Sequence, residues 1–199
     1  MKNINYVLAV DPASDGAAIL ISKKERVHFV WVWRKAQKNY TKVFMLDAYT
    51  IENGEIINQS SRVSQNEGMI GSYISEDIKK DYANIALVCE GSYIDLRARK
   101  GETAKQGRLR KGGNVNAGLC IAGLSHRIIS SETIKASEWR HSLLRLNPFT
   151  DRETCKRVSL TLVPKLCWDI NAVLSHCGKL DHITDACGIG MWKIKGSSL

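Results

Sequence analysis

The chain has 199 residues, of which 44% are hydrophobic and 25% are charged, a composition typical of one well-packed globular domain. Its 29 lysines and arginines exceed its 20 acidic residues, and the net charge of +9 favours a polyanionic partner, nucleic acid first. No stretch of the chain approaches the roughly 18 apolar residues of a membrane helix, and the first residues lack the pattern of a signal peptide. We therefore expect one domain over residues 1–199 and a cytoplasmic protein.

Three apolar segments come first in the chain and predict strands at 4–10, 17–22 and 27–33, joined by short turns into an antiparallel meander. The stretch 34–64 reads as an insertion, in which 42–50 is a candidate strand and 52–58 a turn with a short extended piece. Apolar residues at helical spacing then predict a helix over 66–82.

The unbroken apolar run of 84–91 predicts a buried strand in a parallel arrangement. Small residues over 116–127 predict a helix that packs closely on the sheet, and a short strand follows near 127–131. Further helices are expected over 136–144 and 152–163, the second one closed by Pro164, and a last helix begins near Asp181. This order predicts an α/β fold with a mixed five-stranded sheet, a three-stranded antiparallel meander plus parallel strands, flanked by helices.

The six cysteines form no C-x-x-C pair, and most of them lie in apolar segments. This pattern argues against a zinc ribbon and against a disulfide scaffold. We expect reduced, buried thiols at Cys89, Cys120, Cys155, Cys167, Cys177 and Cys187.

Acidic residues end two of the predicted strands and open the last helix. Asp11 ends the first strand, Glu90 ends the strand at 84–91, and His182 and Asp185 lie three residues apart, so that they share one helix face. Sites in open α/β sheets form at the carboxyl ends of strands, where these side chains can converge. Hard divalent cations prefer such oxygen ligands, and two of them about 4 Å apart can activate water for phosphodiester cleavage.

Each of these residues also has a structural interpretation. Asp11 precedes Pro12 and can be a turn residue, Asp181 can cap the last helix instead of joining a metal site, and His182 can be a packed or surface histidine. Glu90 has no comparable structural role, because a carboxylate at the end of a buried strand is costly unless it is paired.

The segments "AVDPASDGAAIL", "ALVCEGSY" and "DHITDACGIGMW", with "ASEWR" at 136–140, stand in an order that resembles the RuvC-type Holliday-junction resolvases of the ribonuclease H/retroviral-integrase superfamily, most closely their phage and poxviral branch. The resemblance spans nearly the whole chain and implies a ribonuclease H-like fold. It places Asp11, Glu90 and Asp185 on the family's three carboxylate positions and His182 on a fourth position that is Asp or His in the family. The long 34–64 stretch and the basic segment after Glu90 depart from the cellular pattern.

What this resemblance implies is a homodimeric endodeoxyribonuclease that uses two Mg²⁺ or Mn²⁺ ions per active site. Such an enzyme nicks two strands symmetrically across a four-way junction and leaves 5′-phosphate and 3′-hydroxyl ends, in DNA recombination and repair. If a phage encodes the chain, the expected location is the host cytoplasm.

A basic loop follows Glu90, over about 92–114. Residues 95–114 hold seven cations and two acids, a net charge of +5, and four glycines. A mobile cationic segment beside a metal site suits contact with a phosphate backbone, although a solvated loop without function has the same composition. The predicted DNA contacts are Tyr93, Arg97, Arg99, Lys100, Lys105, Arg108, Arg110, Lys111 and Lys156.

Other side chains near these motifs have two interpretations. Tyr93 can stack on a base or simply pack, and Lys135, Arg140 and Arg157 can line the DNA path or be plain surface cations. The alternating aromatic residues of 29–33 favour strand packing over base stacking, and one face of that strand is a candidate dimer interface.

Other functions fit parts of the same pattern. The same chemistry serves nucleases of flap, packaging or hybrid substrates, and the same fold can carry a DNA-binding protein without catalysis. Sugar kinases and actin-like ATPases also begin with a strand that ends in Asp, but they need a second domain and further phosphate loops, for which the chain has neither room nor sequence.

Overall fold

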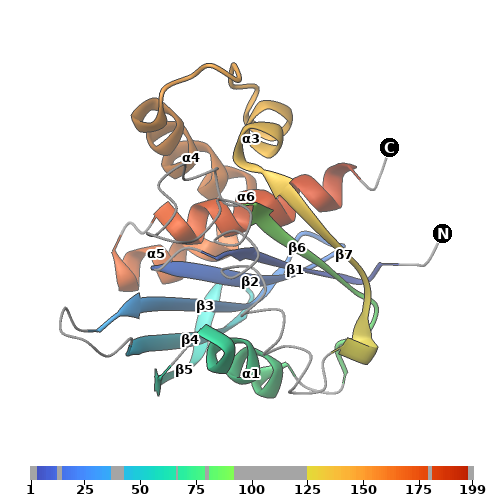
Figure 1. Ribbon diagram of the computed structural model, residues 1–199, viewed down its shortest axis with the longest axis vertical. Coiled ribbons are helices and arrows are strands. Elements are labelled where there is room, and N and C mark those ends of the chain that lie inside the picture. The colour runs from blue at the N-terminus through green and yellow to red at the C-terminus, as the bar shows by residue number, and fades with distance from the viewer. Residues whose placement is uncertain are drawn as a thin grey trace, which may run out of the picture.

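The computed structural model describes residues 4–12, 15–36, 43–65, 67–78, 81–91, 125–178 and 181–196. In this part of the chain, seven strands form one mixed sheet with helices on both faces (Figure 1). The strands are β1 (Tyr6–Asp11), β2 (Gly16–Ser22), β3 (Val27–Lys35), β4 (Phe44–Glu52), β5 (Glu55–Ser64), β6 (Ile85–Gly91) and β7 (Ile128–Lys135). The helices are α1 (Glu67–Asp77), α3 (Ala136–Leu144), α4 (Arg152–Leu166), α5 (Asn171–Cys177) and α6 (Asp181–Gly196), with short 3₁₀ turns η1 (Ser125–Arg127) and η2 (Trp168–Ile170).

The sheet has the strand order β5-β4-β3-β2-β1-β6-β7. Strands β1 to β5 form an antiparallel meander, whereas β6 pairs in parallel with β1 on one side and with β7 on the other. The expected buried parallel strand at 84–91 is therefore confirmed. Because β1, β6 and β7 run in one direction, their carboxyl ends meet at the same edge of the sheet.

The prediction of five strands is wrong, because the stretch 34–64 supplies the β4–β5 hairpin. Its turn is Asn53-Gly54, and both residues have positive φ angles, 51° and 79°, as a tight hairpin turn requires. The β5 strand is an edge strand with mostly polar, solvent-facing residues. It has little of the apolar alternation by which strands are recognised in sequence.

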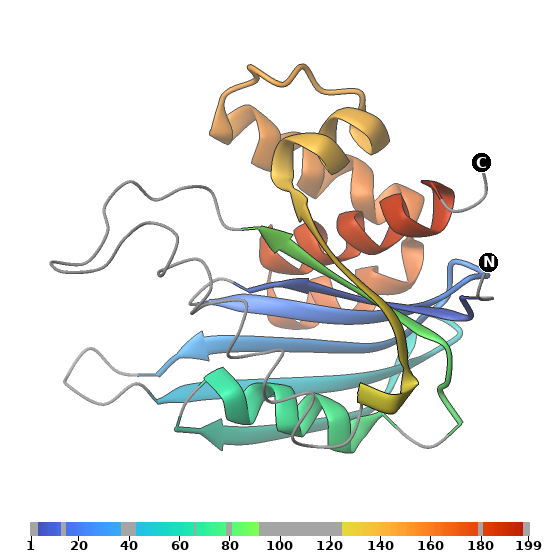
Figure 2. The ribbon, with the colours of Figure 1, turned by 45° about the vertical axis from the view of Figure 1, so that its right-hand side comes forward.

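Side-chain alternation divides the core into two layers, one on each face of the sheet, and Figure 2 shows the helices that cover these two faces. On one face Leu8, Val10 and Leu87 pack with the isoleucines of α1. On the other face Val7, Ala9 and the neighbouring strands are covered by α6, with α3, α4 and α5 around it. Helix α6 crosses β1 and β2 and contacts β6, and its first turn lies near the edge of the sheet where β1 and β6 end (Figure 2).

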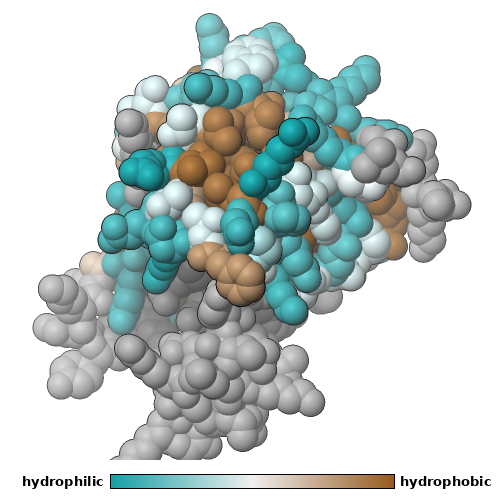
Figure 3. All heavy atoms as spheres, turned by 90° about the horizontal axis from the view of Figure 1, so that it is seen from above, coloured by the Kyte–Doolittle hydropathy of each residue, from teal (hydrophilic) through white to brown (hydrophobic). Residues whose placement is uncertain are grey.

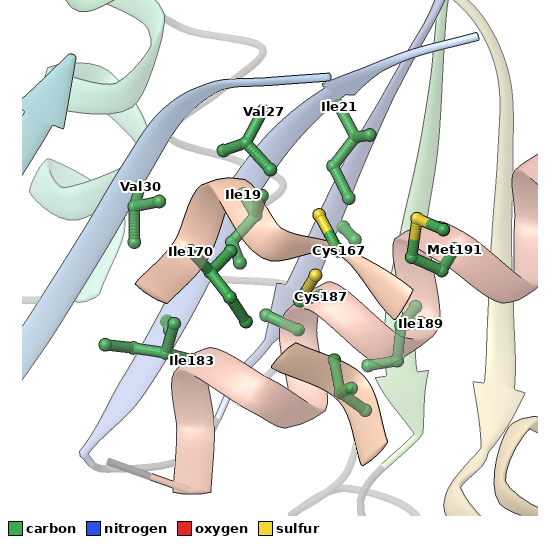
Figure 4. Close-up of a cluster of buried hydrophobic side chains, with 14 of the residues drawn as sticks. Ile19, Ile21, Val27, Val30, Cys167, Ile170, Ile183, Cys187, Ile189 and Met191 are labelled. Atoms are coloured by element: carbon green, nitrogen blue, oxygen red, sulfur yellow. The ribbon is translucent and has the colours of Figure 1, made fainter. Parts of the chain in front are cut away.

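Helix α6 is buried continuously from Ile183 to Met191. Figure 4 shows its apolar side chains against β2 and β3, with Cys187 beside Cys167 of the segment after α4. Gly188 lets α6 approach α3 closely, since a Cβ atom at this position would lie 2.4 Å from Cζ3 of Trp139. The five described cysteines form no disulfide, and four of them are buried, as the sequence predicts; Cys120 lies outside the described residues.

Three further expectations have clear outcomes. Helix α4 does not stop at Pro164 but continues to Leu166, because a proline in the last turn removes only one intrahelical hydrogen bond. The α1 helix is shorter than 66–82, and most of the helix expected at 116–127 lies outside the described residues.

Phe29, Trp31 and Trp33 pack in the core as expected, but no face of β3 is left for a dimer interface, since Val30 and Val32 are buried on the opposite side.

Seen from above, hydrophobic residues gather on the surface among hydrophilic ones (Figure 3). Helices α3 and α4 and the segment after α3 carry partly buried apolar residues at Leu143, Leu146, Val158, Leu162 and Leu166. Of the helices in the described ranges, none combines the length and apolarity needed to cross a membrane.

Candidate active site

Two acidic side chains lie next to each other at the carboxyl edge of the sheet. Val10 of β1 pairs with Cys89 of β6, so the next residues, Asp11 and Glu90, are neighbours across the two strands. Their apolar neighbours Val10 and Cys89 face α1, and successive strand residues alternate between faces. Asp11 and Glu90 therefore point to the face that α6 covers.

The first turns of α6 bring His182 and Asp185 to the same place. Nδ1 of His182 lies 2.8 Å from Oδ2 of Asp11, and since a carboxylate only accepts hydrogen bonds, this nitrogen carries the proton. Burial opposes protonation of the ring, but the hydrogen bond to Asp11 and the charges of Asp11, Asp181 and Asp185 raise the pKa of His182. Residues from β1 and α6, far apart in sequence, are thus joined directly.

Asp185 is a buried carboxylate, 7% exposed, whose partner comes from α3. Nη2 of Arg140 donates a hydrogen bond of 2.7 Å to its Oδ2. Burial raises the pKa of Asp185 to about 6, while the positive charge of Arg140 opposes the rise. The interpretation of Arg140 as a plain surface cation is therefore wrong: its side chain is 15% exposed and paired within the site.

Glu90 is the acid whose negative charge is least balanced by positive neighbours. Burial raises its pKa to about 8, and the nearby charges of Asp11 and Asp185 add to the rise, whereas Arg140 opposes it. The Trp139 indole faces this carboxyl and favours its charged form, although Nε1 makes no hydrogen bond of normal geometry within the described residues. Trp139 belongs to the "ASEWR" segment, but nothing in the local pattern predicts a role for it at this site.

A second ion pair flanks the site. Asp181, the first residue of α6, pairs with Lys156 of α4, and its Oδ1 lies 3.8 Å from Nε2 of His182. Burial alone would raise the pKa of Asp181, but the hydrogen bond from Lys156 and the charge of His182 lower it. Lys156 is the one predicted DNA contact in the described part, and it is half-exposed and paired; its DNA role stays a prediction.

The donor set fits a cation, but the side chains do not form a ready-made metal cage. Oε2 of Glu90 and Oδ1 of Asp185 are buried without a hydrogen-bond partner among the described residues, and buried carboxylates close together repel unless a cation compensates them. In the described ranges, no three His, Cys, Asp or Glu side chains stand close enough together to hold a metal ion. A metal-binding and catalytic role for Asp11, Glu90, His182 and Asp185 therefore stays a prediction.

The basic loop cannot be placed against this site. Residues 92–124 lie outside the described residues, and with them Tyr93 and the seven cations from Arg97 to Lys111. Their contact with DNA stays a prediction. Lys135 and Arg157 are exposed, as expected for surface cations.

Comparison with known proteins gives a likeness of fold only. No protein-family model matches the chain, and no curated protein matches it. A Thermus thermophilus RuvC structure aligns over 97% of this chain and 96% of its own, at 14% identity and a TM-score of 0.49. The structure of T. thermophilus RuvC in complex with Holliday junction substrate aligns at the same coverages, 9% identity and a TM-score of 0.46. Because both likenesses are weak, we base the functional proposal on the side chains of the site.

Proposed function

We propose that this chain is a divalent-metal-dependent endonuclease on a ribonuclease H-like fold that resolves four-way DNA junctions. One observation carries the proposal: Asp11, Glu90 and Asp185, from two strands and a helix, gather with His182 at one edge, and two of their carboxylate oxygens are buried without a partner among the described residues. An acidic cluster of this kind is costly without a cation. The order of the sequence motifs, which resembles RuvC-type resolvases, agrees with this chemistry.

The residues of the chain have separate tasks in this proposal. Asp11, Glu90 and Asp185 supply oxygen ligands for Mg²⁺ or Mn²⁺, and His182 supplies a nitrogen ligand from the same turn of α6. Two bound ions would activate water and stabilise the leaving oxygen of the phosphodiester. Trp139 of α3, which is fully buried, favours the charged form of Glu90.

Symmetric nicking of a junction needs two sites, so the proposal includes a homodimer. The two active sites would each cut one strand and leave 5′-phosphate and 3′-hydroxyl ends. Sedimentation of the free protein and of its complex with a four-way junction measures the subunit number. A single subunit on the junction would contradict paired cleavage.

Cleavage of matched substrates tests the activity. A four-way junction, a flap, a linear duplex and an RNA–DNA hybrid are each incubated with the protein and Mg²⁺ or Mn²⁺. We expect the junction to be cut first, and Asp11→Asn and Glu90→Gln to abolish cleavage while junction binding is retained. Glu55→Gln, at an exposed position in β5, is the matched control and should cleave normally.

The same experiment separates the alternatives. Preference for a flap or hybrid would assign the site to a different nuclease of the same chemistry. Binding without any metal-dependent cleavage would point to a DNA-binding protein on the same fold. Cleavage that survives in Asp11→Asn or Glu90→Gln would remove the proposed site altogether.

A further inference from the structure

Arg140 is placed unusually for a cation beside a candidate metal site. It projects from α3 between Trp139, whose ring centre is 5.0 Å from its guanidinium carbon, and Asp185, to which it donates a 2.7 Å hydrogen bond. Its side chain is 15% exposed, and its Nε is buried without a hydrogen-bond partner among the described residues. The guanidinium is therefore paired with Asp185 through Nη2, and its Nε–H group remains without an acceptor among the described residues.

The charge of Arg140 acts on more than one acid. Arg140 makes a direct hydrogen bond from Nη2 to Asp185, and it opposes the rise in pKa of both Asp185 and Glu90. Only one oxygen of Asp185 accepts from Arg140, and the other, Oδ1, is buried and free among the described residues. A divalent ion held by Glu90 and Asp185 would thus share the carboxylate of Asp185 with the Arg140 guanidinium.

This arrangement sets two positive charges in competition. In a site with little water, like charges a few ångströms apart repel strongly, and Arg does not lose its proton in proteins. A DNA phosphate at the site would add the missing negative charge, and a guanidinium with free donors binds phosphate well. Asp185 and Glu90 supply two negative charges against the three positive charges of a divalent ion and the guanidinium, and a DNA phosphate supplies the third.

We infer that Arg140 couples metal binding to DNA binding: it weakens the affinity of the free protein for divalent cations, and a DNA phosphate that engages the guanidinium relieves this effect. The inference rests on the proposed function, because it needs a metal at the acids and DNA at their edge. Arg140 is then a positioning and coupling residue, and the site loads its metal fully only on substrate.

Mn²⁺ binding, followed by calorimetry or by the signal of the free ion in electron paramagnetic resonance, tests this inference without using activity. We expect Arg140→Gln to bind Mn²⁺ in the absence of DNA roughly tenfold more tightly than the wild-type protein, or more. Arg140→Lys keeps the charge and should stay near wild type. Arg34→Gln removes another Arg–Asp pair, Arg34 with Asp47 at 3.1 Å on the surface, and should change nothing.

A second titration uses a four-way junction made resistant to cleavage by phosphorothioate linkages around its branch point. Junction binding should tighten Mn²⁺ binding in the wild-type protein and much less in Arg140→Gln, because coupling between two ligands is reciprocal. If Arg140→Gln does not fold, Arg140→Met, which keeps an apolar stem beside Trp139, replaces it in both titrations.

The outcomes separate the two proposals. If the wild-type protein binds no Mn²⁺ with or without the junction, the proposed function fails. If the wild-type protein binds Mn²⁺ but Arg140→Gln binds it equally or more weakly, or Arg140→Lys binds it as tightly as Arg140→Gln, the inference is overturned while the nuclease assignment stands. A loss of metal affinity in Arg140→Gln would mean that Arg140 only holds Asp185 in place.

Discussion

Glu90→Gln should make the metal-free protein more stable, because burial and neighbouring acids disfavour the charged form of the Glu90 carboxyl in the native fold. Burial is the main reason that its pKa rises from 4.5 to about 8, and the charges of Asp11 and Asp185 contribute the rest. Between these two values the folded protein keeps a proton that the unfolded chain has lost. The stability gained from this retained proton is therefore fully present below the lower pKa, and it is lost as the pH rises through the higher one.

The size of the effect follows from the shift. At about pH 7.5 the ionisable Glu90 lowers the free energy of unfolding by up to roughly 4 kcal/mol relative to a neutral side chain, and at about pH 6 by up to roughly 2 kcal/mol. Asp185, whose pKa rises from 3.8 to about 6, adds a loss in the same direction at lower pH. Above about pH 6 His182, whose pKa is raised, titrates in both proteins, so the difference between wild type and Glu90→Gln is what reports on Glu90.

Urea unfolding in the presence of a chelator measures this difference. Wild type, Glu90→Gln and the exposed control Glu55→Gln are compared at about pH 6 and pH 7.5, and the gain of Glu90→Gln should grow by up to roughly 2 kcal/mol between them. A gain of the same size at both pH values, or no gain, would show that Glu90 is not held against its charge, and the main argument for a cation at the site would be lost.

Three other variants or conditions test the surrounding structure. Excess Mn²⁺ should stabilise the wild-type protein in urea unfolding without the chelator, by about 2.7 kcal/mol at a hundred times its dissociation constant, and should stabilise Glu90→Gln much less; equal stabilisation would place the metal elsewhere. Asp169→Ala should cost about 2–3 kcal/mol, because buried Asp169 accepts from Arg26 Nε at 2.9 Å and from a backbone N–H at 3.0 Å; an unchanged urea midpoint would contradict this. Gly188→Ala should cost about 1–3 kcal/mol and reduce cleavage, since the new Cβ atom would push Trp139 away from the site; normal stability with normal cleavage would show that α3 and α6 can separate freely.

The sequence predicts the central part of the fold well because its signals there are local and strong. Two segments are buried: the apolar run that ends in Glu90 and the small residues of α6. Each can be recognised in the sequence without knowing which element it packs against. The β5 strand is different, since its polar residues are stabilised by pairing with β4, a contact that no local pattern reveals. The Asn53-Gly54 turn was the available signal for that hairpin.

The same distinction applies to the site. The acids are visible in the sequence because a carboxylate at the end of a buried strand or inside a buried helix has few structural uses. Their cationic partners are not visible, because a lysine or arginine on an amphipathic helix resembles any solvated side chain until the packing of that helix is known. Arg140 and Lys156 could be paired with Asp185 and Asp181 only after α3 and α4 were placed against α6.

The placement of these cations says how the acidic site can exist in a folded protein without its metal. Two positive side chains from neighbouring helices pair with the acids, Arg140 of α3 with Asp185 and Lys156 of α4 with Asp181, and His182 of α6 makes a hydrogen bond to Asp11. Glu90 is left with the highest pKa of the acids, and it can stay neutral until a stronger positive charge arrives. The helices that cover this face therefore balance the site as well as burying the sheet, and a substitution in α3 or α4 should change metal binding as readily as one in the strands that carry the acids.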